Sequence, residues 1–500
     1  MLKRFNLPWM LIALLLCTLP VLGQAPGEAI AIDASGPSRP FPHYWEQMFG
    51  SGRAILTLRD SWRRDLREVK QITGLQFVRF HAIFHDEVGV YDEDKDGRPI
   101  YNFSYVDQIY DGLLANGVKP FVELSFMPYK LAARPDIQAF WYRPNVAPPK
   151  DYAKWDDMIT QFTRHLVERY GIDEVTSWYF EVWNEPNIDF WKGTPSQESY
   201  FELYDHSARD IKSVDRRLRV GGPSTAQAAW VDAMIQHAVK LNIPLDFVST
   251  HVYGNDTAND VFKTNEKIPR DQMVCRAVKM VHDQIKASTR PDLPLIWSEF
   301  NAAYDNEVAV TDSIYMGPWM ATTIGQCDGL TQMMSYWSVS DVFEEQGVVK
   351  QPFYGGFGLI AAGGIPKPSF YAFEILHYLG DRRIDNSNRD VLVTKAKDGS
   401  LVVAVWNLVN PGSTGSPRAV RLDFKGVSPD ATASIARVDS QHGDTLDLYD
   451  KMGKPRYPTQ AQIQQLDRGS RLKSSEERHL KNGSLELQLP VNGLAVIQVR

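Results

Sequence analysis

Short apolar runs rich in β-branched residues alternate with amphipathic stretches from about residue 45 to residue 380. In one amphipathic stretch, apolar residues recur at steps of three and four from Trp155 to Tyr170, which predicts a helix that ends at Gly171. Eight strand–helix units predict an α/β fold, a (β/α)8 TIM barrel over residues 43–380. A doubly wound open sheet is the alternative, but no GxGxxG sequence follows the first strand. The predicted strands are Met48–Gly50, Leu75–His81, Lys119–Phe126, Trp178–Trp183, Leu218–Gly222, Phe247–Tyr253, Leu295–Phe300 and Met333–Trp337.

The pattern changes after Gly380, where β runs are separated by Gly, Asp, Asn and Pro turns. These runs predict an accessory C-terminal β-sandwich over residues 381–500. Residues 24–42 form an N-terminal segment, in which we expect Glu28–Asp33 to cross over and join the sandwich. No flexible Ser/Pro-rich linker precedes the sandwich, so a structural cap is favoured over a separate carbohydrate-binding module. Residues 450–482 are polar and aperiodic, and we expect a long loop or a hairpin insertion there.

The first 23 residues have the features of a signal peptide. Lys3 and Arg4 precede the apolar run Trp9–Cys17, and a helix-breaking proline and small residues follow. The run is short for a membrane span, and an uncleaved anchor is the alternative. We therefore expect an exported protein, periplasmic or secreted, that has no membrane partner after cleavage.

Cys275 and Cys327 are the two cysteines outside this leader. They could pair in an oxidising compartment, but nothing in the sequence demands a bond, so we interpret them as structural thiols. No CxxC or HExxH pattern occurs, and neither a metal site nor a cofactor is predicted. The formal net charge of −7 argues against a nucleic-acid partner. Nothing in the sequence predicts an oligomeric state.

Two glutamates, Glu185 and Glu299, each follow or end a predicted strand. The carboxyl ends of barrel strands meet at one rim, where the active sites of such barrels lie. Cleavage of a glycosidic bond needs one carboxyl group that gives a proton and one that attacks or activates water. Glu185 lies between Asn184, a suitable donor to a sugar hydroxyl, and Pro186, which stops the strand. A surface role for Glu185, or a structural pair of Glu299 with Arg79, is the alternative.

Other polar and aromatic residues follow neighbouring strands and are candidates to bind substrate at the same rim. A lone histidine is more often structural than catalytic, and two adjacent acids are often a solvated loop, so each has a structural alternative. An acid that faces the cleft would bind a pair of sugar hydroxyls. These candidates are His81, His251, Tyr253, Trp337, Glu344 and Glu345.

The chain resembles glycoside hydrolase family 39, a barrel family that includes retaining β-xylosidases and α-L-iduronidases. The resemblance covers roughly residues 43–380. The Asn-Glu-Pro element alone would indicate only the wider clan of barrel glycosidases. A set of nine motifs in the same order along the chain is more specific. The motifs are Gly50-Ser-Gly-Arg-Ala54, Val78-Arg-Phe-His81, Lys119-Pro-Phe-Val-Glu-Leu-Ser-Phe-Met-Pro128, Phe180-Glu-Val-Trp-Asn-Glu-Pro186, Trp297-Ser-Glu-Phe-Asn301, Ser335-Tyr-Trp337, Asp341-Val-Phe-Glu-Glu345, Gly356-Phe-Gly-Leu359 and Gly364-Ile-Pro-Lys-Pro368.

The resemblance implies that Glu185 is the acid/base and Glu299 the nucleophile of a retaining mechanism. It also implies that Asn184 holds the substrate's 2-hydroxyl. Ser298 stands where relatives often have threonine, and both hydroxyls are short donors. Hydrogen-bond donors that would keep Glu299 ionised are expected from Asn301, Ser298 and Tyr253. The implied substrate-binding residues are His251 and Tyr253 beside the nucleophile, Glu344 or Glu345 for the hydroxyls, and Phe126 with Phe190 or Trp191 as stacking walls.

The resemblance leaves the sugar open, and the acids at Glu344 and Glu345 favour a neutral sugar over a uronate. We therefore expect an enzyme that removes β-D-xylosyl residues from xylo-oligosaccharides. The alternatives are a family 39 hydrolase of an α-L-arabinopyranoside or an α-L-iduronide, and an enzyme that cuts within polysaccharide chains. A more remote alternative is a sugar-binding protein without catalytic activity.

Overall fold

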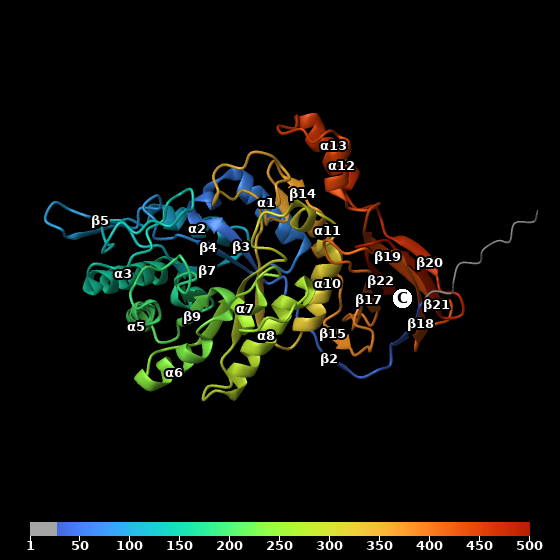
Figure 1. Ribbon diagram of the computed structural model, residues 1–500, viewed down its shortest axis with the longest axis horizontal. Coiled ribbons are helices and arrows are strands. Elements are labelled where there is room, and N and C mark those ends of the chain that lie inside the picture. The colour runs from blue at the N-terminus through green and yellow to red at the C-terminus, as the bar shows by residue number, and fades with distance from the viewer. Residues whose placement is uncertain (1–27) are drawn as a thin grey trace, which may run out of the picture.

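The computed structural model describes residues 28–500, so the predicted leader at residues 1–23 lies outside the described residues. Within them, eight parallel strands close into a barrel in the order β10-β11-β12-β3-β4-β7-β8-β9 (Figure 1). The predicted barrel is confirmed, and each of its strands overlaps a predicted strand. The barrel strands are β3 (Met48–Arg53), β4 (Phe77–His81), β7 (Lys119–Leu124), β8 (Tyr179–Val182), β9 (Arg219–Thr225), β10 (Phe247–His251), β11 (Leu295–Phe300) and β12 (Met333–Tyr336).

The barrel interior is apolar at one end and charged above it. A buried apolar cluster closes the N-terminal ends of the strands, and β9 contributes Gly221 beside it because a Cβ there would lie 2.4 Å from the Phe247 carbonyl oxygen. Alternate residues of a strand point to the same side. On β4 this alternation places Arg79 two residues above Phe77 and on the same side of the strand. The cluster consists of Met48, Phe77, Phe121, Tyr179, Phe247, Ile296 and Met333.

Helices surround the barrel on its outside (Figure 1). The predicted helix at Trp155–Tyr170 is confirmed as α3, whose buried residues recur at steps of three and four and which ends at Gly171. No helix among residues 28–500 is long and apolar enough to cross a membrane. The helices of this part are η1 (Ala54–Leu58), α1 (Asp60–Ile72), α2 (Ser104–Leu114), α3 (Tyr152–Tyr170), α4 (Ile172–Val175), α5 (Ser196–Val214), η2 (Ala226–Ala228), α6 (Val231–Leu241), α7 (Ala258–Phe262), α8 (Arg270–Ala287), α9 (Val308–Thr311), α10 (Met316–Cys327) and α11 (Pro368–Leu376).

Two further sheets lie beyond α10 and α11, on the side of the molecule that carries the C-terminus (Figure 1). One has the order β1-β18-β21 and the other the order β2-β15-β16-β17-β22-β19-β20. The N-terminal strand β1 pairs in parallel with β18, as expected for Glu28–Asp33. Side chains of both sheets share one buried apolar cluster, which includes Leu422 and Val403. The strands are β1 (Glu28–Asp33), β2 (Ser38–Pro40), β15 (Arg382–Ile384), β16 (Val391–Lys395), β17 (Leu401–Trp406), β18 (Arg418–Lys425), β19 (Thr432–Val438), β20 (Glu476–His479), β21 (Ser484–Leu489) and β22 (Leu494–Val499), and two hairpins elsewhere are β5 (Tyr91–Glu93) with β6 (Pro99–Tyr101) and β13 (Ile360–Ala361) with β14 (Ile365–Pro366).

The expectation of a long loop or a hairpin at residues 450–482 is wrong. The segment includes α13 (Gln460–Ser470), which follows α12 (Thr445–Lys451) and projects with it from the molecule (Figure 1). Thr459 begins α13 with a capping box, in which its hydroxyl accepts from the Gln462 N–H and the Gln462 side chain accepts from the Thr459 N–H. This Thr-x-x-Gln spacing was the sequence signal for the helix. Leu466 is the one apolar residue of α13 that is buried, so the sequence shows no helical period of apolar residues there.

Cys275 of α8 and Cys327 of α10 form a disulfide. The interpretation of these residues as thiols is therefore wrong. Both sulfurs are buried between neighbouring outer helices, a proximity that the sequence spacing does not reveal.

We expect the Cys275→Ala/Cys327→Ala double variant to lose about 2–4 kcal/mol of unfolding free energy. The bond closes a sequence separation of 52 residues, and a crosslink over such a loop lowers the entropy of the unfolded chain. Urea denaturation of the oxidised wild type, the reduced wild type and the variant measures the effect. Equal midpoints for the oxidised and reduced wild type would contradict the expected role of the bond.

Candidate active site

A pocket of about 470 Å³ opens at the C-terminal ends of the barrel strands. This is the end opposite the apolar cluster that closes the barrel. The pocket wall brings together residues that lie far apart in the sequence. Nine of the predicted site residues line it, namely His81, Asn184, Glu185, Phe190, His251, Tyr253, Glu299, Trp337 and Glu345.

Glu185 and Glu299 face each other in this pocket. One oxygen of each carboxyl group and a ring nitrogen of His251 all lie within 4.8 Å of one another. Glu299 lies on β11, whereas Glu185 follows β8 with a backbone φ of 45°. A positive φ is strained for a residue other than glycine, and such strain concentrates at functional sites. The Glu185 N–H donates to the Ser224 carbonyl oxygen at 2.8 Å and holds the turn.

Glu299 is bound by two donors. Arg79 donates from Nη1 to one carboxylate oxygen at 2.6 Å, and the Tyr253 hydroxyl donates to the other at 2.6 Å. Burial raises the pKa of Glu299 above its ordinary value, and Arg79, His81 and Tyr253 oppose that rise. The expected donor Tyr253 is therefore present. The other two expected donors are wrong, because the Ser298 hydroxyl donates to Glu181 and the Asn301 amide donates to the Trp337 carbonyl oxygen.

A chain of hydrogen bonds places a proton on Glu185. Ser298 donates its hydroxyl proton to Glu181 at 2.6 Å, so its oxygen accepts from His251 Nε2 at 3.0 Å. His251 is neutral because burial, with Arg79 nearby, lowers its pKa well below the ordinary value. Its Nδ1 therefore carries a lone pair, and it accepts from Glu185 Oε1 at 3.1 Å.

The electrostatics of Glu185 agree with this assignment. Burial raises its pKa well above the ordinary value, and the negative charge of Glu299 raises it further. No cation contacts Glu185 among the described residues, whereas Arg79 contacts Glu299 directly. Of the two facing carboxyls, Glu185 therefore holds the proton and Glu299 carries the charge.

His81 and Glu345 line the pocket beside Glu299. His81 Nδ1 pairs with Glu123 at 2.8 Å, and its Nε2 lies 3.8 Å from Glu299 and 3.7 Å from Glu345. Burial would lower the pKa of His81, but Glu123 above all, together with Glu299, raises it on balance. Burial raises the pKa of Glu345 to about 8, so this side chain can donate as well as accept a hydrogen bond at neutral pH.

Three predicted substrate-binding residues do not line the pocket. Glu344 lies outside the lining, and its carboxylate is paired with Arg59 at 2.6 Å and with Arg53 at 3.1 Å. Phe126 is fully buried behind Phe190, and their rings stack with centroids 6.0 Å apart. Trp191 is buried as well and donates its ring N–H to Ser199. Of the two proposed stacking walls, only Phe190 reaches the pocket.

Asn184 is oriented by the same arginine that binds Glu299. Its side-chain oxygen accepts from Arg79 Nη2 at 2.9 Å. The amide NH₂ group is therefore the part of Asn184 that remains to donate to a ligand.

Long loops contribute residues that the sequence did not predict. Asp256 accepts the Tyr253 N–H at 2.7 Å, and burial raises its pKa to about 6. Phe357 stands in the Gly356-Phe-Gly-Leu359 motif, which was a usable signal. The others lie in loops or in the short helix η2, without a periodic pattern. The residues missed are Gln138, Phe140, Ile188, Asp189, Ala226, Gln227, Asp256, Tyr304, Gln346 and Phe357.

A buried lysine fixes the loop that carries Glu345. Lys367 Nζ lies 2.6 Å from a carboxylate oxygen of Asp312 and 2.6 Å from one of Asp341, and it donates to the Gly356 carbonyl oxygen at 2.9 Å. All three charged side chains are buried. The loop after β12 is therefore held from inside the protein.

The chain is similar to known glycosidases over most of its length. Residues 28–484 match the family model described as glycosyl hydrolases family 39. A β-xylosidase of Geobacillus stearothermophilus is 36% identical over 472 residues, which cover 92% of this chain and 93% of that protein.

Solved structures give the same result. A family 39 β-xylosidase from Caulobacter crescentus superposes with a TM-score of 0.82 and 33% identity, over 95% of this chain and 100% of that one. A family 39 enzyme from Xanthomonas axonopodis pv. citri gives a TM-score of 0.85 and 33% identity, over 96% of this chain and 99% of that one. The chain belongs to glycosyl hydrolases family 39.

Proposed function

We propose that this protein is a retaining β-xylosidase that removes β-D-xylosyl residues from xylo-oligosaccharides. The observation that carries the proposal is the facing pair of carboxyls, with a proton on Glu185 and a charge on Glu299. Their nearest oxygens lie within 4.8 Å of each other. In direct attack the two carboxyl groups lie ~5–5.5 Å apart, whereas a pair that works through an intervening water needs ~6.5–9.5 Å. Oxygens this close favour direct attack.

In the first step, a Glu299 oxygen attacks the anomeric carbon while the glycosidic C–O bond breaks. The proton of Glu185 passes to the departing oxygen, and a glycosyl ester forms on Glu299. Glu185 then takes a proton from water, whose oxygen attacks the anomeric carbon and releases the sugar from Glu299. Two inversions give net retention. Arg79 and Tyr253 keep the nucleophile in place and stabilise its charge when it leaves the sugar.

The charges of the pocket favour a neutral sugar. Five lining residues are acids, namely Glu185, Asp189, Asp256, Glu299 and Glu345, and the described lining includes no lysine or arginine. Arg53 and Arg59 lie nearby, but both are paired with Glu344, and Arg53 is also paired with Glu87. A uronate carboxylate would thus meet the negative charge of Glu299 without a free lysine or arginine, whereas hydroxyls would meet acceptors and the Asn184 amide.

We also infer that the protein is exported. The predicted leader at residues 1–23 and the Cys275–Cys327 disulfide both suit the periplasm or the outside of the cell. The two C-terminal sheets, with their shared apolar cluster, are proposed to form a β-sandwich that supports α10 and α11 as a structural cap.

A panel of nitrophenyl glycosides tests the function. We expect turnover of the β-D-xyloside to exceed that of the α-L-arabinopyranoside, with no turnover of the α-L-iduronide, because the pocket lacks a cation for the uronate. NMR of the first product should show the β anomer. Preference for the iduronide, cleavage only within polymers, or binding without hydrolysis would each replace the proposal with the corresponding alternative.

The Glu185→Ala variant should separate substrates by their leaving groups. Without the acid, we expect xylobiose hydrolysis to fall by about a thousandfold or more, whereas dinitrophenyl xyloside, which needs little protonation, should form the glycosyl ester at a nearly normal rate. Azide should then restore turnover and give β-xylosyl azide, because the small anion can occupy the space of the lost carboxyl. Equal losses for both substrates would exclude the acid role.

The Tyr253→Phe variant should move the acid limb of the pH profile. Glu299 works only when ionised, so activity is lost as pH falls through its pKa. Loss of the hydroxyl removes an interaction that lowers this pKa, so we expect the acid limb of kcat/KM to shift to higher pH, with about a tenfold to hundredfold lower rate. Tyr449→Phe, which removes a hydroxyl on α12, is the control. An unchanged acid limb would contradict the assignment.

A further inference from the structure

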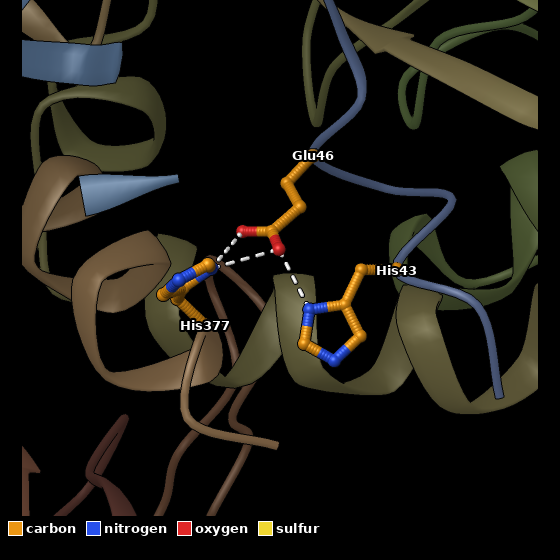
Figure 2. A group of neighbouring side chains, drawn as sticks. All are labelled: His43, Glu46 and His377. Carbon is orange, nitrogen blue, oxygen red and sulfur yellow. Dashed lines mark hydrogen bonds and ion pairs between the residues drawn. The ribbon is translucent and has the colours of Figure 1, made fainter. Parts of the chain in front are cut away.

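His43, Glu46 and His377 form a cluster at the N-terminal end of the barrel, away from the sugar pocket. His43 and Glu46 precede β3, and His377 ends α11. Figure 2 shows both rings directed at the Glu46 carboxylate from two sides. His43 Nδ1 lies 2.6 Å from Glu46 Oε1, and His377 Nδ1 lies 2.8 Å and 3.0 Å from the two carboxylate oxygens.

The second nitrogen of His43 is held by the backbone. Nε2 lies 2.9 Å from the Leu379 carbonyl oxygen, which can only accept, so Nε2 carries a hydrogen. In the neutral ring Nδ1 then has a lone pair directed at a carboxylate oxygen, and two lone pairs repel each other at that distance. Either a proton or a cation must lie between them. A ring whose far N–H is held by a carbonyl is the usual arrangement of a histidine that binds a metal ion.

We propose that His43, Glu46 and His377 bind a divalent transition-metal ion of the zinc class. Two imidazoles and one carboxylate are a ligand set that zinc accepts, with water as the fourth ligand. Ligand atoms of the three residues all lie within 4.8 Å of one another. The proposal is independent of the sugar chemistry.

The site can adjust to the ion. Bonds of ~2.0–2.1 Å in a tetrahedron place ligand atoms about 3.3 Å apart, so each histidine nitrogen must move away from the Glu46 oxygen that it contacts by less than about 1 Å. The His377 side chain is 42% exposed and has room to move. A cavity lined by His43, Gln47 and Gly74 adjoins the cluster and gives water access. Gly74 leaves space beside the carboxylate, because a Cβ at this position would lie 3.1 Å from a Glu46 oxygen.

The ion would join two distant parts of the chain. His43 and Glu46 stand where the chain begins the first barrel strand, and His377 stands where it leaves α11 for the C-terminal sheets. No local motif marks such a site, because Glu46 and His377 are 331 residues apart.

Calorimetric titration of chelator-treated protein with zinc chloride tests the proposal. We expect the wild type to bind one ion with a Kd in the micromolar range or below, and the His377→Ala variant to bind at least tenfold more weakly. The control is His206→Ala, since His206 pairs with one carboxylate, Asp156 at 2.8 Å, and no second histidine is in that pair. The melting temperature should rise with zinc in the wild type and in the control, but not in His377→Ala.

Two results would overturn the proposal. Zinc binding that is equal in the wild type and His377→Ala would place the ion elsewhere, and Glu185, His251 and Glu299 are the other suitable group among the described residues. Inhibition of xyloside turnover by zinc in both proteins would identify that group. No binding at millimolar zinc would mean that protons, shared between two imidazoles and Glu46, hold the cluster together.

Discussion

The guanidinium of Arg79 is fully buried inside the barrel, where it binds carboxylates from three other strands. Glu123, Glu181 and Glu299 lie 2.7, 2.5 and 2.6 Å from its nitrogens. A buried charge is costly unless it is paired and hydrogen-bonded, and the planar fork of arginine satisfies several partners at once. These carboxylates raise the pKa of Arg79, so its charge is permanent. The negative charge on Glu299, the orientation of Asn184 and the spacing of β4, β7, β8 and β11 all depend on this cation.

The apolar cluster beneath Arg79 makes this arrangement possible. Phe77 and Phe121 belong to the apolar layer that fills the N-terminal end of the barrel, so the charged layer lies between this apolar layer and the pocket. Low polarity strengthens each electrostatic contact in that layer. It also keeps His251 neutral and Glu185 protonated. Opposite protonation states of two facing glutamates thus result from their positions relative to one arginine.

Much of the fold was readable from the sequence because barrel strands are buried on both faces and appear as apolar runs. Glu185 and Glu299 were predictable for a related reason, since an acid directly after such a run lies at the rim. Side-chain direction was not predictable. Ser298 and Asn301 stand beside Glu299 in sequence but point elsewhere, whereas Arg79, considered only as a structural partner, is a main donor. Tyr304 and Gln138 come from aperiodic loops, and the Cys275–Cys327 pair depends on how two helices pack.

The pairing of β1 with β18 links the two ends of the polypeptide. Glu28 of β1 and Arg418 of β18 are 390 residues apart. During synthesis β1 therefore has no strand to pair with until β18 has been made. The sheet β1-β18-β21 cannot form before β18 and β21 have been made, so its assembly depends on contacts between segments far apart in the sequence.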